Sequence, residues 1–258
     1  FRRVLFRSLG ASTDEAQELV AIEAAEILGG FLLRGEVRHA VNMMPLTAAE
    51  MSDVRVYLDL ARRLGLLLAQ LNRGQQVKAA QLVFRGEAAS KNTRIITSAF
   101  AAGLLEQALD DYVNIVNAEL LAKERGIRIS EQVSTEQGDF ATLIRATVET
   151  ESGRLEAAGT IFGRQFQRLV RFGEFALDAH LDGVLLIYHH RDVPGQIGFL
   201  GSTLGKHGVN IAHMALGRVA PGGSAVGVFN LDSLPPEEAL AEIRNNPVCT
   251  GVRSEEHT

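Results

Sequence analysis

Hydrophobic residues follow a helical period through the first part of the chain. Over residues 12–33 apolar positions recur every three or four residues, which predicts an amphipathic helix. Ser12 and Glu15 form a capping-box pair at its start. A second pair of this type opens a helix predicted over residues 47–71. The segment between the two helices, residues 35–45, is predicted to be a linker.

Beyond residue 77 the pattern shortens to an alternation of apolar and polar positions, which is typical of half-buried strands. Strands are predicted over residues 77–83, 127–133, 141–150, 155–162 and 168–172. Two helices interrupt them, over residues 93–109 and 118–125. Helices and strands segregated in this way favour an α+β domain with a mixed or antiparallel sheet.

A new order of elements begins at Gly183. We expect strand, helix, strand, strand, helix and strand over residues 184–189, 196–207, 209–217, 224–231, 235–245 and 248–252. This βαββαβ order is that of the ferredoxin-like fold. The fold class is therefore α+β, with an α+β domain followed by a ferredoxin-like βαββαβ domain.

Composition narrows the class of protein. A chain of 258 residues with 46% apolar and 22% charged residues is an ordinary globular chain of one to three domains. The net charge of −5 argues against a nucleic-acid surface, and no apolar run reaches the roughly 18 residues of a membrane span. The single cysteine, Cys249, fits a reducing compartment, so we expect a cytoplasmic protein.

The two ends of the chain look foreign to the rest. Residues 4–8 back-translate as GTG CTC TTC CGA TCT, and residues 253–257 as AGA TCG GAA GAG CAC. The two strings are reverse complements and resemble a sequencing adapter. We therefore expect residues 1–8 and 253–258 to be adapter-derived artefacts without packed contacts, because a foreign tail has no reason to match the core.

Catalytic motifs are missing from the sequence. It contains no G-x-S-x-G, H-E-x-x-H or P-loop, and the glycines around Gly195 and Gly198 do not have the Rossmann order. His189 and His190 are adjacent on a predicted strand and therefore face opposite sides, so they do not chelate one ion together. We expect no metal site.

The segment over residues 190–195 carries the most chemical information. It ends a predicted strand and starts a helix, whose first backbone N–H groups are free to bind an anion. Asp192 beside those donors suits a zwitterionic ligand. The Asp192 carboxylate would bind the ammonium of the ligand, and the helix N-terminus would bind the carboxylate of the ligand. Asn210, at the start of the next strand, would add an amide. The alternative is that Asp192 caps the helix and Asn210 closes a turn.

The same segment carries a family resemblance. Arg191-Asp192-Val193-Pro194-Gly195, followed by Ile197-Gly198, Leu204-Gly205 and Gly208-Val209-Asn210-Ile211-Ala212, resembles the ACT domain of phosphoglycerate dehydrogenases. In that family the positions that match Asp192 and Asn210 bind serine across a dimer interface. The position that matches His190 often adds a polar contact. The implied serine site is His190, Asp192, Val193, Pro194, Gly195, Ile197 and Asn210.

Matches continue through nearly all of residues 9–252. Residues 9–17 resemble the family's L-G-A-S-T-x-E-A-Q stretch, and residues 35–43, 117–127 and 159–163 resemble further segments of long-form members. The resemblance implies the following order: a substrate-binding-domain remnant over 9–42, an intervening regulatory domain over 43–182 and an ACT domain over 183–252. In the intervening domain, Arg168 and His180 match positions that hold an anionic effector; solvated surface is the alternative for Arg168.

The resemblance also implies what the chain lacks. The parent reaction is the NAD-dependent oxidation of 3-phosphoglycerate to 3-phosphohydroxypyruvate, the entry to serine synthesis. The family's catalytic histidine precedes the L-G-A-S-T stretch, where this chain has Ser8, and the nucleotide-binding domain lies further upstream. We expect no catalytic residues and no cofactor in this fragment, because hydride transfer needs a held cofactor and a base within reach.

Three functional hypotheses follow. The chain is a regulatory region that binds L-serine or a similar amino acid and self-associates through its ACT and intervening domains. Alternatively, it is a structural assembly piece without a ligand, or the regulatory part of an iron–sulfur serine dehydratase. The L-G-A-S-T stretch argues against the last, and a serine titration separates the first two.

Overall fold

The computed structural model describes residues 13–34, 48–72, 75–106, 108, 113–136 and 138–257. It divides into two units, Phe1–Asp53 and Val54–Thr258. Helix α1 (Asp14–Arg34) belongs to the first unit, and α2 (Ala48–Leu71) begins there and continues into the second. Within the described residues no helix is both long enough and apolar enough to cross a membrane.

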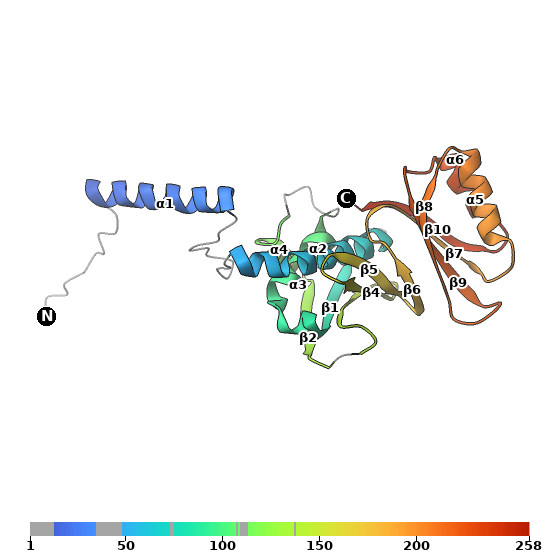
Figure 1. Ribbon diagram of the computed structural model, residues 1–258, viewed down its shortest axis with the longest axis horizontal. Helices are drawn as coiled ribbons and strands as arrows, with labels where there is room; N and C mark the ends of the chain where they lie inside the picture. Colours follow the sequence, from blue (N-terminus) through green and yellow to red (C-terminus); the bar gives the residue numbers. More distant parts are fainter. Residues whose placement is uncertain are drawn as a thin grey trace. The chain divides into compact units, whose positions relative to one another are not determined.

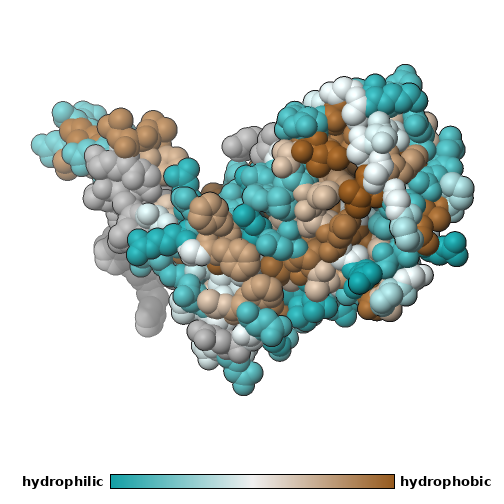
Figure 2. Space-filling view, turned by 45° about the vertical axis from the view of Figure 1, so that its right-hand side comes forward, coloured by the Kyte–Doolittle hydropathy of each residue, from teal (hydrophilic) through white to brown (hydrophobic). Residues whose placement is uncertain are grey.

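Helix α1 confirms the first predicted helix and starts at Asp14, directly after Thr13. The Thr13 hydroxyl Oγ1 accepts a hydrogen bond from the backbone N–H of Ala16 at 3.2 Å, which makes Thr13 the N-cap. The predicted cap, Ser12, lies outside the described residues. Figure 2 shows brown, hydrophobic surface on this helix. The exposed large apolar side chains of α1 are Leu19, Val20, Ile22, Leu28, Phe31, Leu32 and Leu33. A helix with this much apolar surface depends on a packing partner for its stability.

The second unit contains a mixed six-stranded sheet of order β2-β1-β3-β4-β5-β6 (Figure 1). β1 and β2 are parallel, whereas the other neighbours are antiparallel. The strands are β1 (Val77–Gly86), β2 (Arg128–Ser134), β3 (Thr142–Thr150), β4 (Arg154–Phe162), β5 (Phe166–Phe172) and β6 (Phe175–Ala179). Their positions confirm the five predicted strands. The sequence analysis missed β6, which is short and follows β5 after the two residues Gly173 and Glu174.

Helices α2 and α3 (Thr93–Leu105) cross at very short range. A Cβ atom at Gly103 would lie 2.0 Å from the Arg62 carbonyl oxygen, and one at Gly65 would lie 2.2 Å from the Phe100 carbonyl oxygen. Both crossing points therefore require glycine. Residues of α2, of α3 and of the sheet form the core here. Fully buried are Leu60, Leu64, Leu67 and Leu68 of α2, Phe100 of α3, and Phe84 and Ile144 of the sheet. η1 (Glu87–Ser90) and α4 (Ala118–Glu124) complete this region.

The remaining elements form a second, antiparallel sheet of order β10-β7-β9-β8. Its strands are β7 (Gly183–Arg191), β8 (Ile211–Arg218), β9 (Ser224–Leu231) and β10 (Cys249–His257). Helices α5 (Gln196–Lys206) and α6 (Glu237–Arg244) cover one face (Figure 1). Leu186, Tyr188, Leu200, Leu204 and Phe229 are buried between the helices and the sheet. The predicted βαββαβ order is confirmed.

The opposite face of this sheet is also buried. Leu185 and Ile187 alternate with the helix-facing residues of β7 and are 0% and 1% exposed. The His189 ring lies 5.6 Å from the ring of Phe172 and 6.2 Å from that of Phe175, which belong to the six-stranded sheet. Contact on both faces explains why β7 is a continuous apolar run instead of an alternating one.

Strand β10 corrects one expectation about the chain ends. Residues 253–257 were expected to make no packed contacts, yet they pair with β7 from Ile187 to Gly183. In addition, the Arg253 guanidinium donates to the Gln70 carbonyl oxygen at 3.2 Å. The expectation failed because strand pairing uses backbone groups that every sequence carries, so even a foreign tail extends a sheet. Residues 1–8 lie outside the described residues, and the adapter origin of both ends stays a prediction.

Candidate ligand pocket

A cavity of about 350 Å³ lies where β7 ends and α5 begins. It collects six of the seven predicted site residues from one continuous segment: His190, Asp192, Val193, Pro194, Gly195 and Ile197. The β8–β9 hairpin closes the other side with Leu216, Gly217, Arg218 and Ala225. The predicted ligand segment is therefore assembled into a pocket within a single copy of the chain, whereas Asn210 does not line it.

The N-terminus of α5 opens onto this cavity without a side-chain cap. Gly195 is the N-cap residue with φ 91°, a left-handed conformation that glycine adopts without strain. No side chain of the described residues caps the helix there. The first N–H groups of α5 have no partner within the helix and carry the positive end of its dipole. They are thus available to an anionic group in the cavity.

Asp192 binds the β8–β9 hairpin. Its Oδ2 accepts hydrogen bonds from Arg218 Nη1 at 3.0 Å and from the Gly222 backbone N–H at 3.2 Å. Its own N–H donates to the Gly223 carbonyl oxygen at 2.8 Å. The hydrogen bond from Arg218, followed by that from Gly222, lowers the pKa of the Asp192 carboxyl, so Asp192 is an anion. The alternative role of Asp192 as a cap of α5 is wrong.

His190 presents a buried atom without a partner. The side chain is 6% exposed, and its ring stacks on the Tyr188 ring with centroids 4.8 Å apart. Nδ1 lies 2.7 Å from the Arg191 carbonyl oxygen, which only accepts hydrogen bonds, so Nδ1 carries the proton. In the neutral ring Nε2 is then an acceptor. Nε2 is buried and has no hydrogen-bond partner among the described residues.

Tyr188 and Gln196 support the His190 ring from behind the cavity. The Tyr188 hydroxyl donates to Gln196 Oε1 at 2.9 Å, and the Asn246 side-chain amide donates to the same oxygen at 3.2 Å. Burial raises the pKa of Tyr188 to about 12, so the hydroxyl keeps its proton at neutral pH. The stacked ring and this hydrogen bond fix the position of the His190 imidazole.

Asn210 lies outside the pocket within one copy of the chain. Its Nδ2 donates to Asp232 Oδ2 at 2.8 Å, and its backbone carbonyl oxygen accepts from the Asp232 backbone N–H at 3.1 Å. These bonds tie the start of β8 to the end of β9, as the turn-closing alternative predicts. A ligand contact from Asn210 requires a second copy of the chain.

Arg218 lines the pocket but was not predicted as a site residue. Arg218 is separated from Asp192 by 26 positions, and only the β8–β9 hairpin brings the two together. No local motif marks it. The only signal in the sequence was its position directly after the strand predicted over residues 209–217. Five more residues that line the cavity were not predicted as site residues: Gln196, Gly198, Leu216, Gly217 and Ala225.

The two residues of the predicted anion site are neighbours, but Arg168 is already paired. Arg168 Nε lies 3.3 Å from Asp178 Oδ1, and its Nη1 donates to the Gln167 carbonyl oxygen. The His180 ring meets the His213 ring edge-on at 4.5 Å. Burial, followed by the nearby Arg168 charge, lowers the pKa of His180, so His180 is a weak anion partner at neutral pH. The described residues contain no group of three or more side chains suited to a metal ion.

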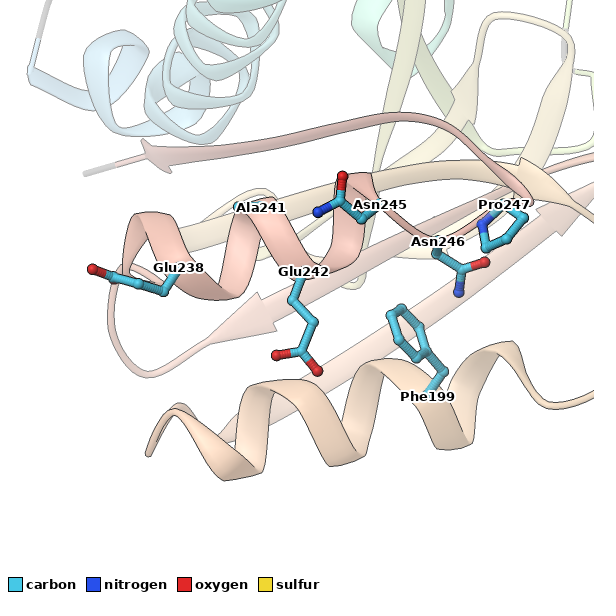
Figure 3. A pocket seen from close by; sticks show the side chains of 7 residues that line it. All are labelled: Phe199, Glu238, Ala241, Glu242, Asn245, Asn246 and Pro247. Atoms are coloured by element: carbon cyan, nitrogen blue, oxygen red, sulfur yellow. The ribbon is translucent and has the colours of Figure 1, made fainter.

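A shallower hollow lies between α5 and α6 (Figure 3). Its lining includes Phe199 and Glu242, and the Glu242 carboxylate points towards α5. Lys206 Nζ lies 2.9 Å from Glu242 Oε2, and His207 Nε2 lies 3.4 Å from the same oxygen. The hydrogen bonds from Lys206 and His207 lower the pKa of Glu242. Since the Glu242 carboxylate is already paired, this hollow is a weaker candidate than the cavity beside His190.

Comparisons with known proteins cover both regions. Residues 53–173 match the model of the D-3-phosphoglycerate dehydrogenase intervening domain, and residues 183–248 match the ACT domain model. A D-3-phosphoglycerate dehydrogenase from Synechocystis sp. is 37% identical over 241 residues, with 93% of this chain and 43% of the relative covered. The Methanocaldococcus jannaschii enzyme of that name is 35% identical over 239 residues, with 92% and 45% covered. The Bacillus subtilis enzyme is 31% identical over 245 residues, with 95% and 46% covered. The chain thus spans less than half of the length of these relatives.

Proposed function

Because the chain belongs to the D-3-phosphoglycerate dehydrogenase family, whose intervening and ACT domains it carries, we propose that it senses L-serine or a close small amino acid for such an enzyme. The parent reaction would be the NAD-dependent oxidation of 3-phosphoglycerate to 3-phosphohydroxypyruvate. Serine is the end product of the route that this reaction opens, so binding at the ACT domain would provide feedback control.

The charge layout of the cavity beside His190 carries this proposal. Asp192 supplies a carboxylate whose pKa is lowered, and the uncapped N-terminus of α5 supplies N–H donors on the same cavity. A free amino acid carries one group for each of these partners. Charge-assisted hydrogen bonds of this type contribute about 1.5–3 kcal/mol each. Three or four of them would support micromolar to millimolar binding after the costs of association.

The buried His190 Nε2 supports a ligand with a hydrogen-bond donor. An unpaired buried acceptor costs free energy, and a ligand that donates to it removes this cost. The ammonium of any amino acid can donate, and the serine hydroxyl can do so as well. Serine therefore matches the cavity better than an amino acid of the same size with an apolar side chain.

Calorimetric titration with L-serine, glycine and L-alanine tests the proposal. We expect heat and a thermal shift with serine, and weaker binding of alanine because it lacks the hydroxyl. If millimolar serine and glycine give neither heat nor a thermal shift, the region is a structural assembly piece without a ligand.

The chain by itself should not oxidise 3-phosphoglycerate. No Rossmann glycine motif occurs in its sequence, and the position of the family's catalytic histidine is Ser8. We expect no NADH formation from 3-phosphoglycerate and NAD above a protein-free control. The B. subtilis enzyme of full length serves as the positive control, and measurable turnover by this chain would contradict the assignment of its role.

The ACT domain should pair with a second copy through β8. This strand is hydrogen-bonded to β9 on one side only, and it exposes Met214 (47%) and Leu216 (52%). An edge strand with exposed apolar residues is a ready surface for pairing. Pairing would also bring Asn210 of one copy towards the cavity of the other.

Sedimentation equilibrium at micromolar concentration tests the pairing. We expect twice the 27.9 kDa chain mass for the wild type and a monomer for Met214→Lys. Leu234→Lys, which replaces a similarly exposed residue outside β8, is the matched control. A wild-type chain that stays monomeric with and without serine would rule the dimer out.

A further inference from the structure

Arg218 occupies the mouth of the cavity beside His190. Its side chain is 59% exposed, it lines the cavity, and its Nη1 lies 3.0 Å from Asp192 Oδ2. The α5 N-terminus opens onto the same cavity. A guanidinium, the positive end of a helix dipole and one carboxylate therefore share this space, so its charge is positive on balance.

This arrangement discriminates against a ligand that is only a cation. The Asp192 carboxylate already has the Arg218 guanidinium as its partner. An ammonium that approaches Asp192 meets the repulsion of that guanidinium unless the ligand also brings an anion. A carboxylate on the ligand removes the repulsion, because it lies between the guanidinium and the helix N-terminus and binds both.

We infer that Arg218 is the specificity-determining residue that selects a free α-carboxylate in this pocket. The inference rests on the proposed amino-acid function and adds the ligand class: free amino acids bind, whereas amines, amino-acid amides and amino acids whose carboxylate lies in a peptide bond are rejected. On binding, the direct pair of Asp192 and Arg218 becomes a pair bridged by the ligand, with the ammonium on Asp192 and the carboxylate on Arg218. The buried His190 Nε2 is the independent feature that marks the cavity as a ligand site.

The alternative explanation is that Arg218 has a purely structural role. The Asp192 carboxylate also accepts from the Gly222 N–H, and its backbone binds Gly223, so Arg218 could serve only to fasten the hairpin turn. In that role its removal would disturb the pocket for every ligand alike. A thermodynamic cycle between a protein group and a ligand group separates the two roles.

The cycle compares L-serine with L-serinamide on the wild type and on Arg218→Met. Serinamide keeps the ammonium and the hydroxyl but replaces the carboxylate by a neutral amide. Titrations at about pH 7 keep both ammonium groups mostly protonated, because the pKa of an α-amino group is about 7.7–8.0. We expect Arg218→Met to weaken serine about tenfold, since the contact is partly exposed to water. Serinamide should bind Arg218→Met as well as the wild type or more tightly, because the competing guanidinium is gone.

Two further variants keep the test sharp. Arg218→Lys retains the charge without the planar fork and should lose less serine affinity than Arg218→Met. Arg244→Met removes an arginine that pairs with Glu237 on the same domain but does not line the cavity, and it should leave both ligands unaffected. Thermal unfolding of each variant checks that the fold is retained.

The outcomes are distinct. The inference is overturned if Arg218→Met binds serine within threefold of the wild type, or if it weakens serine and serinamide by the same factor. Serinamide that stays below detection in both proteins also counts against the inference, because removal of the competing guanidinium should let it bind to Arg218→Met. If the wild type binds no serine at all, the proposed function fails and the inference falls with it, whereas serine binding without dependence on Arg218 defeats the inference alone.

Discussion

Asp192→Asn should weaken L-serine binding by about one to two orders of magnitude. Asparagine keeps the size of the side chain and an oxygen that can accept from the Gly222 N–H, so the hairpin contact survives. What is lost is the negative charge that would hold the ligand ammonium. A hydrogen bond between two charged groups is roughly twice as strong as one between neutral groups, so its loss weakens binding more than the loss of a neutral contact.

Calorimetry with the wild type and Asp192→Asn measures this effect directly. Glu237→Gln is the matched control, because it removes a carboxylate of the same domain that pairs with Arg244 away from the cavity. The control should bind serine like the wild type. Equal affinity of the wild type and Asp192→Asn would show that the ligand site has been placed wrongly.

Gly103→Ala should destabilise the second unit by about 3 kcal/mol. The new Cβ would lie 2.0 Å from the Arg62 carbonyl oxygen and 3.0 Å from the Leu66 backbone N, so both obstacles are backbone atoms of α2. No rotation of a side chain relieves such a clash, and the helices have to move apart over a buried core. Overpacking of this kind typically costs about 1–3 kcal/mol, and the upper end applies because two helices are displaced.

Gly201→Ala is the control for the change of residue type itself. Gly201 lies inside α5, and a Cβ there would have nothing within 4 Å. Alanine is a better helix former than glycine by about 0.8–1.0 kcal/mol, so this variant should be more stable than the wild type. Urea denaturation followed by circular dichroism compares the two, and a Gly103→Ala variant as stable as the wild type would refute the close crossing of α2 and α3.

Local patterns account for the elements that were predicted correctly. The helical period of residues 47–71 and the alternation in strands such as β1 depend on neighbours within a few positions, so they are legible without a structure. The same holds for six pocket residues, because the end of a strand and the start of a helix follow each other between His190 and Ile197. The mixed sheet was allowed by the sequence, but the parallel pairing of β1 with β2 was not specified by it.

Predictions failed where the outcome depended on partners distant in the sequence. Asp192 was weighed as a cap of the neighbouring helix, but its carboxylate binds Arg218 and Gly222 of a later hairpin. The tail after residue 252 was expected to be unpacked, yet β7 accepted it as a strand neighbour through backbone groups alone. Asn210 binds Asp232 within one chain, and its expected ligand contact across a dimer interface stays a prediction.

By itself, the sequence determined the order of helices and strands, the α+β class and the segment that forms one wall of the pocket, since these depend on periodicity and turn residues that act over short distances. Only the tertiary structure decided which strands are neighbours, that α2 and α3 meet at Gly65 and Gly103, and that Arg218 stands opposite the α5 N-terminus. The physical reason is that strand pairing and helix crossing depend on the burial of the whole core. Alternative contacts between distant residues compete there, and a local sequence pattern does not indicate which of them form.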